Sequence, residues 1–305
     1  MSVILRKKWI FMGISLALMI IAAVSIIFKG FNLDTDFAGG IAVTYEIKSD
    51  FDTKDIENIV SDALGPNQKA SSVQRSNGNE VVIKFGYENG LEDDQARSEF
   101  SLNKVNAITE ALKTKYNGEE NVILKNQDII SPSTGQDLAR SALWMSLLAC
   151  LAILIYVTIR FEFVSGVVAV VCLVHDVLIL LGIYSILGIS VDTSFIAAVL
   201  TVLGYSINNT IVIMDRIREN TRHARKESYA EIADKSVIQT LSRSVNTTIT
   251  TLLTIGMVFI LGVSSIQEFA LPIIIGIFIG FYSSVFDAGS IWATWRDSGV
   301  KGKSK

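Results

Sequence analysis

The chain has few of the residues that build metal centres and disulfide frameworks. Its 305 residues include two cysteines and two histidines, and these form no Cys/His cluster. Cys150 and Cys172 lie inside apolar runs, which favours a small hydrophobic role over a disulfide. A glycine-rich phosphate loop, a nucleophile elbow and a paired-aspartate protease motif are also missing. We therefore predict no bound cofactor, no metal site and no enzymatic activity.

Long apolar runs dominate the sequence instead. Half of all residues are hydrophobic, a proportion typical of membrane proteins. The run from Trp9 to Phe28 has about the 20 residues that a bilayer requires. A cleaved signal peptide is the rival interpretation, but no small-x-small site follows cleanly at Lys29-Gly30-Phe31. We expect an uncleaved helix within residues 1–28, and five more transmembrane helices near 138–159, 164–187, 191–214, 237–263 and 269–292.

Residues 29–137 are polar and predict a separate domain. Residues 41–47 alternate as a strand does, and residues 53–64 carry one apolar face, as an amphipathic helix does. Further strands are expected at 72–75, 80–85 and 121–130, with a helix at 95–116. The order β-α-β-β-α-β is that of a ferredoxin-like fold. The predicted fold class is thus a six-helix membrane protein with an α+β ferredoxin-like domain outside the membrane.

The basic residues predict the orientation of the helices. About half of the 27 Lys and Arg residues fall in four pieces that lie on one side if the N-terminus is inside. These are the N-terminal stub, the turn after residue 159, a loop at 215–236 and a tail at 293–305. Because cytoplasmic segments are enriched in Lys and Arg, we expect both termini in the cytoplasm and the acidic 29–137 domain outside.

The central stretch of the chain carries two adjacent amides, Asn208 and Asn209, just inside the inner end of a predicted helix. Arg243 lies at a similar depth in the next helix, since both Asn209 and Arg243 are about 8–9 Å from the inner ends at about 1.5 Å per residue. That helix repeats polar groups on one face, namely Arg243, Asn246, Thr247, Thr250 and Thr254. Arg243 snorkelling to the headgroups and Asn209 making a packing hydrogen bond would also explain the pattern. The full stripe favours an ion pathway in which Asn209 and Arg243 meet.

Further ionisable residues occur within the apolar runs. His175 and Asp176 lie mid-helix, where they suit a proton relay or a mutually satisfied packing pair. We favour the relay. Asp287 is close to the predicted inner interface, which favours a boundary residue. Asp192 begins a helix, where capping explains it.

Small residues mark two more positions. Gly276, Gly280, Ser284 and Ala288 recur at steps of four in the last helix, which predicts close contact with another helix, in this chain or in a partner. Asp36 is followed by Gly39 and Gly40 after the first helix, and these glycines indicate a sharp turn into the first strand.

Taken together, these motifs resemble the SecD/SecF family of bacterial protein-export subunits, and its SecF branch in particular. The resemblance covers almost the whole chain. It rests on Asp36-Phe37-Ala38-Gly39-Gly40, His175-Asp176, Gly204-Tyr205-Ser206-Ile207-Asn208, Asp215-Arg216-Ile217-Arg218-Glu219-Asn220 and Leu241-Ser242-Arg243. The family belongs to the resistance-nodulation-division (RND) transporters, which have twelve helices in two halves, so the chain is similar to one half.

The resemblance implies a function and partners. It implies a subunit that pairs with SecD, acts with the SecYEG translocon on exported preproteins, and uses the proton- or sodium-motive force. YajC, YidC and membrane lipid are further expected partners, nucleic acid is not, and the location is the bacterial cytoplasmic membrane. One residue departs from the family, because Asn209 stands where an aspartate is usual. An uncoupled paralogue and an RND exporter of small molecules or lipids are therefore the alternatives.

Overall fold

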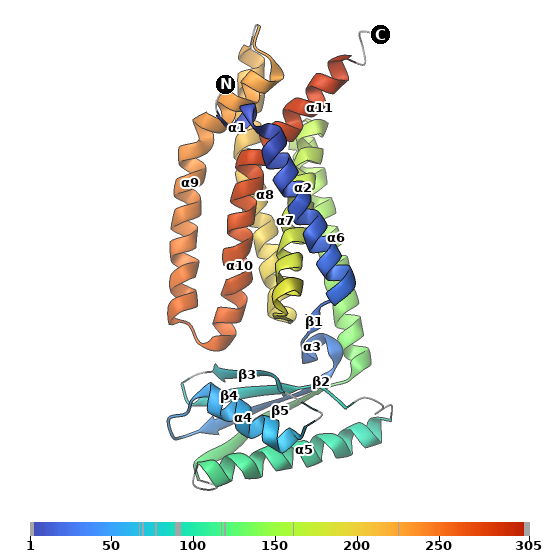
Figure 1. The fold of residues 1–305 in the computed structure, drawn as a ribbon, viewed down its shortest axis with the longest axis vertical. Coiled ribbons are helices and arrows are strands. Elements are labelled where there is room, and N and C mark those ends of the chain that lie inside the picture. Colours follow the sequence, from blue (N-terminus) through green and yellow to red (C-terminus); the bar gives the residue numbers. More distant parts are fainter. Residues whose placement is uncertain are drawn as a thin grey trace.

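The computed structural model describes residues 3–66, 68, 70–76, 78–88, 93–116, 118, 120–160, 162–224 and 226–301. It has two parts, a bundle of long helices and a small α+β domain at one end (Figure 1). Both chain termini lie at the end of the bundle opposite to the domain. The last residues of the predicted tail, 302–305, are outside the described residues.

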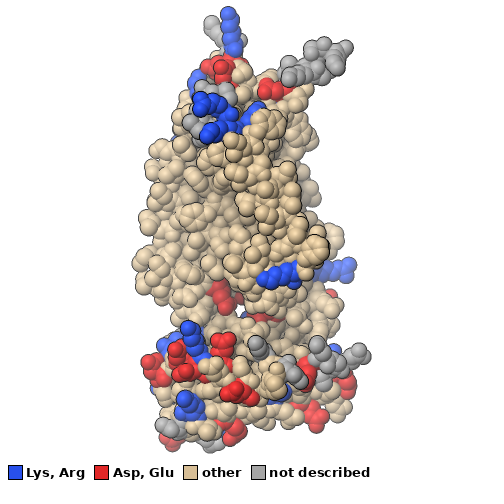
Figure 2. Space-filling model, viewed as in Figure 1, with Lys and Arg blue, Asp and Glu red and all other residues tan. Residues whose placement is uncertain are grey.

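Six helices are long and apolar enough to cross a membrane, within the described residues. This confirms the predicted number. The helices of the bundle, with the short α1 before them, are α1 (Val3–Arg6), α2 (Lys8–Lys29), α6 (Pro132–Arg160), α7 (Phe163–Leu187), α8 (Thr193–His223), α9 (Tyr229–Leu261) and α10 (Ser264–Tyr282) with its extension. That extension is a π-helical segment, η1 (Ser283–Ala288), followed by α11 (Gly289–Lys301). On the face shown in Figure 2, charged side chains gather at the two ends of the molecule, and most of the area between them is uncharged.

The ends of the helices differ from the sequence-based ranges where charged residues begin. The predicted loop at 215–236 is mostly helical, because α8 continues to His223 and α9 already begins at Tyr229. Ser228 and Glu231 form a capping box that starts α9. Arg and Glu are good helix formers, so the loss of hydropathy marks where a helix leaves the apolar layer and not where it ends. The tail behaves likewise, since α11 extends to Lys301.

The predicted ferredoxin-like domain is present with the predicted order of elements. It comprises β2 (Gly40–Ile47), α4 (Thr53–Leu64), β3 (Ala70–Ser76), β4 (Glu80–Phe85), α5 (Asp94–Lys115) and β5 (Val122–Ile130). The sheet is antiparallel, with strand order β3-β4-β2-β5. Helices α4 and α5 cover the sheet face turned away from the bundle (Figure 1). The alternating residues of β2 supply the core on that face, where Ile41, Val43, Tyr45 and Ile47 are fully buried.

Two short elements join the domain to the bundle. Strand β1 (Asn32–Leu33) pairs in parallel with β6 (Ser190–Val191), which precedes α8. The single turn α3 (Thr35–Ala38) then leads into Gly39 and Gly40. A Cβ on Gly39 would lie 2.7 Å from the nitrogen of Pro132, and one on Gly40 would lie 2.6 Å from the carbonyl oxygen of Phe85. Only glycine fits at these approaches, which explains the Gly-Gly pair at the predicted turn.

Candidate functional site

Helix α8 positions the central motif of the sequence. Its N-terminus is capped by Asp192, whose carboxylate accepts a hydrogen bond from the backbone nitrogen of Phe195 at 2.8 Å, as predicted. Ser206 and Asn209 are buried on one side of the helix, whereas Gly204 and Asn208 are exposed on the other. The motif therefore places polar residues both in the interior of the bundle and on its exposed surface.

The buried side of α8 meets the His-Asp pair of α7. The Ser206 hydroxyl donates to Oδ2 of Asp176 at 2.5 Å, and the Ser283 hydroxyl donates to the same oxygen at 3.0 Å. Nδ1 of His175 lies 2.8 Å from the other carboxylate oxygen. Asp176 is fully buried and His175 is 4% exposed. Three donors thus converge on one buried carboxylate, which is how a buried charged group is tolerated.

Asp287 belongs to the same cluster. Its Oδ2 lies 3.9 Å from Nε2 of His175 and accepts a hydrogen bond from Ser15 of α2 at 2.5 Å. With 3% exposure, Asp287 is not a boundary residue, and this expectation is wrong. The last helix begins and ends beyond its apolar run, so Asp287 lies level with the middle of α7 instead of at an end.

The small-residue ridge of α10 contacts α8 in the same chain. A Cβ on Gly276 would lie 2.4 Å from a methyl carbon of Val202, and one on Gly280 would lie 2.9 Å from Cβ of Ser206. One step further, Ser284 hydrogen-bonds Thr210 at 2.9 Å. The three predicted packing positions therefore let α10 approach α8 closely, and they bring Ser283 within reach of Asp176.

No hydrogen bond or ion pair joins Asn209 and Arg243, two described residues that the sequence predicts to meet. Asn209 is 3% exposed and its amide nitrogen has no hydrogen-bond partner. Arg243 is exposed on α9. Their similar depth is thus not sufficient to bring them together within this chain.

Arg243 instead belongs to an exposed polar face on α8 and α9. We call it the outer polar face, and it comprises Gly204, Asn208, Asp215, Arg243, Asn246, Thr250 and Thr254. The Thr250 and Thr254 hydroxyls bond back to carbonyls of their own helix, at 3.0 Å from Asn246 and Thr250 respectively. A hollow of about 340 Å³ lies at one end of this face, lined in part by Asp215, Glu219 and Arg243.

The charged end of the motif ties α8 to α9. Arg216 donates to Glu219 at 2.5 Å and to Gln239 at 2.7 Å. Asn220 donates to Gln239 at 2.9 Å and to Ser236 at 2.8 Å. These hydrogen bonds give Arg216, Glu219 and Asn220 a structural role at the end of the bundle away from the domain. Arg218 lies beside them and lines a separate surface hollow.

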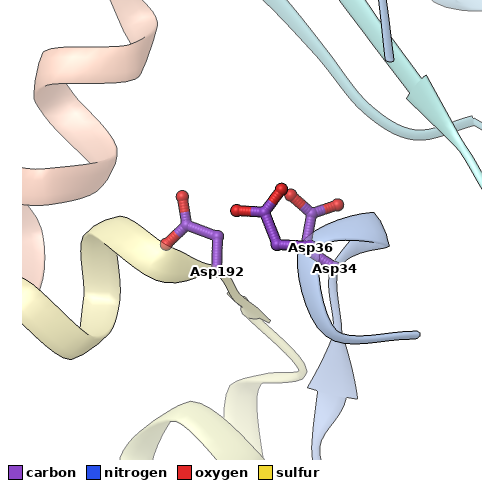
Figure 3. A group of neighbouring side chains, drawn as sticks. All are labelled: Asp34, Asp36 and Asp192. Atoms are coloured by element: carbon purple, nitrogen blue, oxygen red, sulfur yellow. The ribbon is translucent and has the colours of Figure 1, made fainter. Parts of the chain in front are cut away.

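A second charged cluster joins the domain to the bundle, and sequence motifs indicate only its Asp36 and Asp192. The carboxylates of Asp34, Asp36 and Asp192 face one another (Figure 3), with oxygens within 4.8 Å of each other. Lys84 of β4 lies 2.7 Å from Asp34 and 3.7 Å from Asp36. The hydroxyl and backbone nitrogen of Thr193 donate to Asp36 at 2.8 and 3.2 Å.

Lys84 determines the charge balance of this cluster. Burial acts to lower the pKa of Lys84, but the hydrogen bond to Asp34 and the charges of Asp34, Asp36 and Asp192 outweigh it and raise the pKa above its ordinary value. The ammonium group therefore stays charged and supplies a positive charge beside the carboxylates of Asp34 and Asp36. The cluster fits an electrostatic joint between β4, α3 and the start of α8 better than a metal centre.

Comparison with known proteins assigns the chain to a family. Residues 109–298 match the family described as protein export membrane protein SecD/SecF, C-terminal. The chain belongs to the SecD/SecF family. It is 35% identical to the protein translocase subunit SecF of Sebaldella termitidis, over 94% of this chain and 90% of that protein. The SecF of Haemophilus influenzae is also 35% identical, over 91% of this chain and 81% of that protein.

The SecD/SecF relatives also include fused SecDF proteins. The SecDF of Thermus thermophilus is 34% identical over 93% of this chain, which spans only 37% of that longer protein. Its crystal structure, titled as a translocon-associated membrane protein, superposes with a TM-score of 0.77 over 97% of this chain and 39% of SecDF. The chain is therefore a multi-pass membrane protein with the fold of the SecF part of SecDF.

Proposed function

We propose that this protein is the SecF-type subunit of a SecD–SecF complex that assists Sec-dependent protein export across the bacterial cytoplasmic membrane. The observation that carries the proposal is the 35% identity to SecF, which extends through both the membrane helices and the external domain. The relatives are named as translocase subunits, and none of the named functions is catalytic in the enzymatic sense. Fused SecDF relatives support association with SecD.

The outer polar face supports a helical partner. Asn208, Arg243 and Asn246 are exposed in this single chain although they lie on membrane-spanning helices. Polar side chains facing lipid are costly, so such a face needs cover from another bundle. The second half expected for an RND-type assembly would supply that cover, which makes α8 and α9 the proposed contact with SecD.

The orientation follows from the proposed function and the charge pattern. Both termini lie at one end of the bundle and the domain at the other (Figure 1). Cytoplasmic termini place the domain outside, where it would contact the emerging preprotein. SecYEG, YajC, YidC and surrounding lipid are the further partners that the resemblance to SecF implies.

The proton- or sodium-motive force is the proposed energy source. A charge that moves across the membrane potential gains about 2.3 kcal/mol per 100 mV. Asn209 cannot carry such a charge, so the coupling group is another residue of this chain, a carboxylate of SecD, or neither. The last case would make the chain an uncoupled paralogue.

Secretion of a reporter tests this function. The chain is co-expressed with SecD in a strain that lacks its own pair, as native protein, Asn209→Asp and Arg243→Ala, with and without an uncoupler. We expect the native chain to stimulate completion of secretion, the uncoupler to abolish the effect, and Arg243→Ala to reduce it. Stimulation only with Asn209→Asp would identify an uncoupled copy. Stimulation by none of the three would contradict the export function and favour the RND exporter of small molecules or lipids.

A further inference from the structure

The cluster of His175, Asp176 and Asp287 has an arrangement that packing alone does not explain. His175 stands between two carboxylates, with Nδ1 2.8 Å from Asp176 and Nε2 3.9 Å from Asp287. The first contact is a hydrogen bond and the second is too long to be one. All three side chains are at most 4% exposed.

Two atoms of this cluster lack a partner. Nε2 of His175 and Oδ1 of Asp287 are buried and accept or donate no hydrogen bond within the described residues. A buried polar atom left unpaired costs about 1–3 kcal/mol. Nε2 of His175 lies 3.9 Å from the other carboxylate oxygen of Asp287, and a water molecule between the two side chains could supply the missing hydrogen bonds. Asp176, by contrast, has three donors.

A cavity opens next to the unpaired atoms. It measures about 330 Å³ and lies between α2, α7 and the η1–α11 segment. His175, Asp287 and Ser15 form its polar part, and Cys172 borders them. The remaining lining is almost entirely apolar. The space is large enough for water molecules, and the side chains of His175 and Asp287 border it.

The arrangement fits a proton and does not fit a metal ion. Metal ligands converge on one point, whereas these three groups form a row with the imidazole in the middle. In the part of the chain that the structure describes, only Asp34, Asp36 and Asp192 bring three ligand atoms within 4.8 Å of one another. An imidazole is the side chain that can accept a proton on one nitrogen while it releases one from the other.

We propose that His175, Asp176 and Asp287 form a proton-binding relay inside this half-bundle, separate from the outer polar face. A proton from the cavity binds Asp287 or Nε2 of His175. As Nε2 takes up the proton, Nδ1 releases its own to Asp176, so that one proton enters, one moves on, and the imidazole remains neutral. The proposal deepens the proposed export function, because it assigns the coupling ion to H⁺ and its carrier to residues other than Asn209.

The relay is connected to the π-helical segment η1 of the bundle. Ser283 donates to Asp176, and Asp287 faces His175, and both residues lie in the π-helical segment η1. Such segments are uncommon and occur frequently at functional sites. Protonation of either carboxylate weakens the contacts that hold η1 against α7, so the proton occupancy and the position of α10 are linked. This link gives the relay a means to move helices.

Other titratable groups near His175 are few. Among the described residues they are Asp176 and Cys172 on α7, and Tyr282 and Asp287 on the α10–η1 segment, with the Tyr282 ring 6.5 Å from the imidazole. Helix α2 contributes only the hydroxyl of Ser15 to the cluster, and α8 only that of Ser206. A titration seen at His175 therefore reports on this small set.

The two histidines of the chain make a direct spectroscopic test possible. The complex with SecD is prepared with ¹⁵N-histidine in a His223→Gln background, so that every histidine signal of this chain comes from His175. Ring nitrogen shifts in lipid nanodiscs are followed from about pH 4 to about pH 9, a range that brackets ordinary histidine titration. Infrared difference spectra follow the carboxyl band over the same range.

We expect the ring-nitrogen signals of His175 to change from the Nδ1-protonated to the Nε2-protonated tautomer on acidification, at a midpoint that moves by about one pH unit or more in Asp287→Asn. We expect the carboxyl band that appears on acidification to be lost in Asp287→Asn and kept in the control Asp297→Asn. Ser15→Ala keeps the charge of Asp287 and removes only its hydrogen bond, so it should shift the band without removing it. This variant provides the answer if Asp287→Asn fails to fold.

A His175 tautomer that stays fixed over the whole range, with no carboxyl band lost in Asp287→Asn or shifted in Ser15→Ala, would overturn the relay. These spectra do not depend on secretion. If the His175 signals and the carboxyl band change with pH as expected but export is not stimulated, the export function is rejected and the proton site is kept. Uncoupler-sensitive export with a fixed His175 would reject the relay and keep the export function.

Discussion

The two sides of α8 show two ways in which a membrane helix accommodates polar groups. On the inner side, Ser206 donates to Asp176 and Thr210 pairs with Ser284. On the outer polar face, Asn208 and Arg243 are exposed. The first set is satisfied by the chain itself, and the second is the surface that we propose as the contact with SecD. Burial in the single chain thus distinguishes residues that hold this bundle together from residues that are available for contact with another chain.

Glycines make the same distinction. Gly276 and Gly280 face α8 so closely that an added Cβ would fall within 3 Å of Val202 or Ser206. Gly204, on the outer polar face, has no atom within 4 Å of such a Cβ. A small residue in a membrane helix therefore does not by itself show which helix packs against it. The atoms around it do, since Gly276 and Gly280 pack against α8 whereas Gly204 has open space.

Removing the buried carboxylate of Asp176 should lower the stability of the chain more than any of the other proposed substitutions. Asp176→Ala leaves Ser206, Ser283 and His175 without their acceptor, and breaking one partner of a buried charged network costs about 3–5 kcal/mol. Thermal unfolding of the isolated chain, or its recovery from the membrane without SecD, should show this loss. Asp215→Ala on the outer polar face is the control, with a change of about 0.5 kcal/mol or less. Equal losses in both variants would remove the contrast between the two sides.

The joint at Lys84 offers a buried charge pair outside the membrane for comparison. Lys84→Met leaves Asp34, which is 2% exposed, without its cation, and should lower stability by about 3 kcal/mol. The pKa of Lys84 is raised in the folded protein. Its stabilisation is therefore fully present below the ordinary lysine pKa of 10.5 and is lost as the pH rises through the folded value.

Unfolding of native and Lys84→Met protein should therefore differ by a constant amount between about pH 7 and about pH 9, and the difference should shrink at higher pH. Lys125→Met is a suitable control, because the Lys125 side chain is 47% exposed and that of its partner Glu46 is 27% exposed, so their ion pair is accessible to solvent. A difference that grows with rising pH would contradict the assignment of Lys84 as the charged centre of the joint.

Replacing a glycine with alanine should change stability less, and the change should depend on whether the glycine faces α8 or the outer polar face. Gly276→Ala places Cβ against Val202 and should destabilise the chain by about 1–3 kcal/mol, as overpacking does. Gly204→Ala has free space and should leave stability unchanged or slightly raised. Unfolding in the absence of SecD measures both. A destabilised Gly204→Ala would mean that the outer polar face is packed within the isolated chain.

The smallest expected effect concerns the outer polar face alone. Arg243→Ala should not alter the unfolding of the isolated chain, because the side chain of Arg243 is exposed and makes no hydrogen bond or ion pair among the described residues. It should weaken binding to SecD by about 0.6–1.7 kcal/mol, roughly three- to twentyfold. Thermophoresis with labelled SecD in detergent measures the affinity. Unchanged affinity for SecD together with lower stability of the isolated chain would show that Arg243 stabilises this chain and does not bind SecD.

Local sequence patterns were sufficient for the elements of the fold. Apolar runs identified six helices, and the alternation at 41–47 and the apolar face at 53–64 identified β2 and α4. The capping role of Asp192 followed from its place before a helix. These features depend on neighbours along the chain, so they can be read without knowledge of tertiary contacts.

The site depended on contacts that no local pattern contains. Asp287 is buried because Ser15 and His175, from two other helices, meet it. Asn209 and Arg243 share a depth but sit on different sides of their helices. Lys84 is paired with Asp34 across the joint between two parts of the molecule. In each case the relevant quantity was rotation about a helix axis or the docking of one part on another, which depth and hydropathy do not determine.

The attachment of the domain has a mechanical consequence. The chain enters the domain at β2 and leaves it at β5, which are neighbouring strands, and Gly39 and Pro132 touch where the two connections reach the bundle. At the far edge of the sheet, Gln74 of β3 holds Glu268 at 2.6 Å and Ser265 at 3.1 Å at the start of α10. The domain is thus attached to the bundle at both sides of its sheet, through its two covalent connections beside β2 and β5 and through Gln74 on β3, with the Lys84 joint on β4 between them. Because Gln74 is bonded to the first turn of α10, a shift of α10 acts directly on the β3 side of the domain.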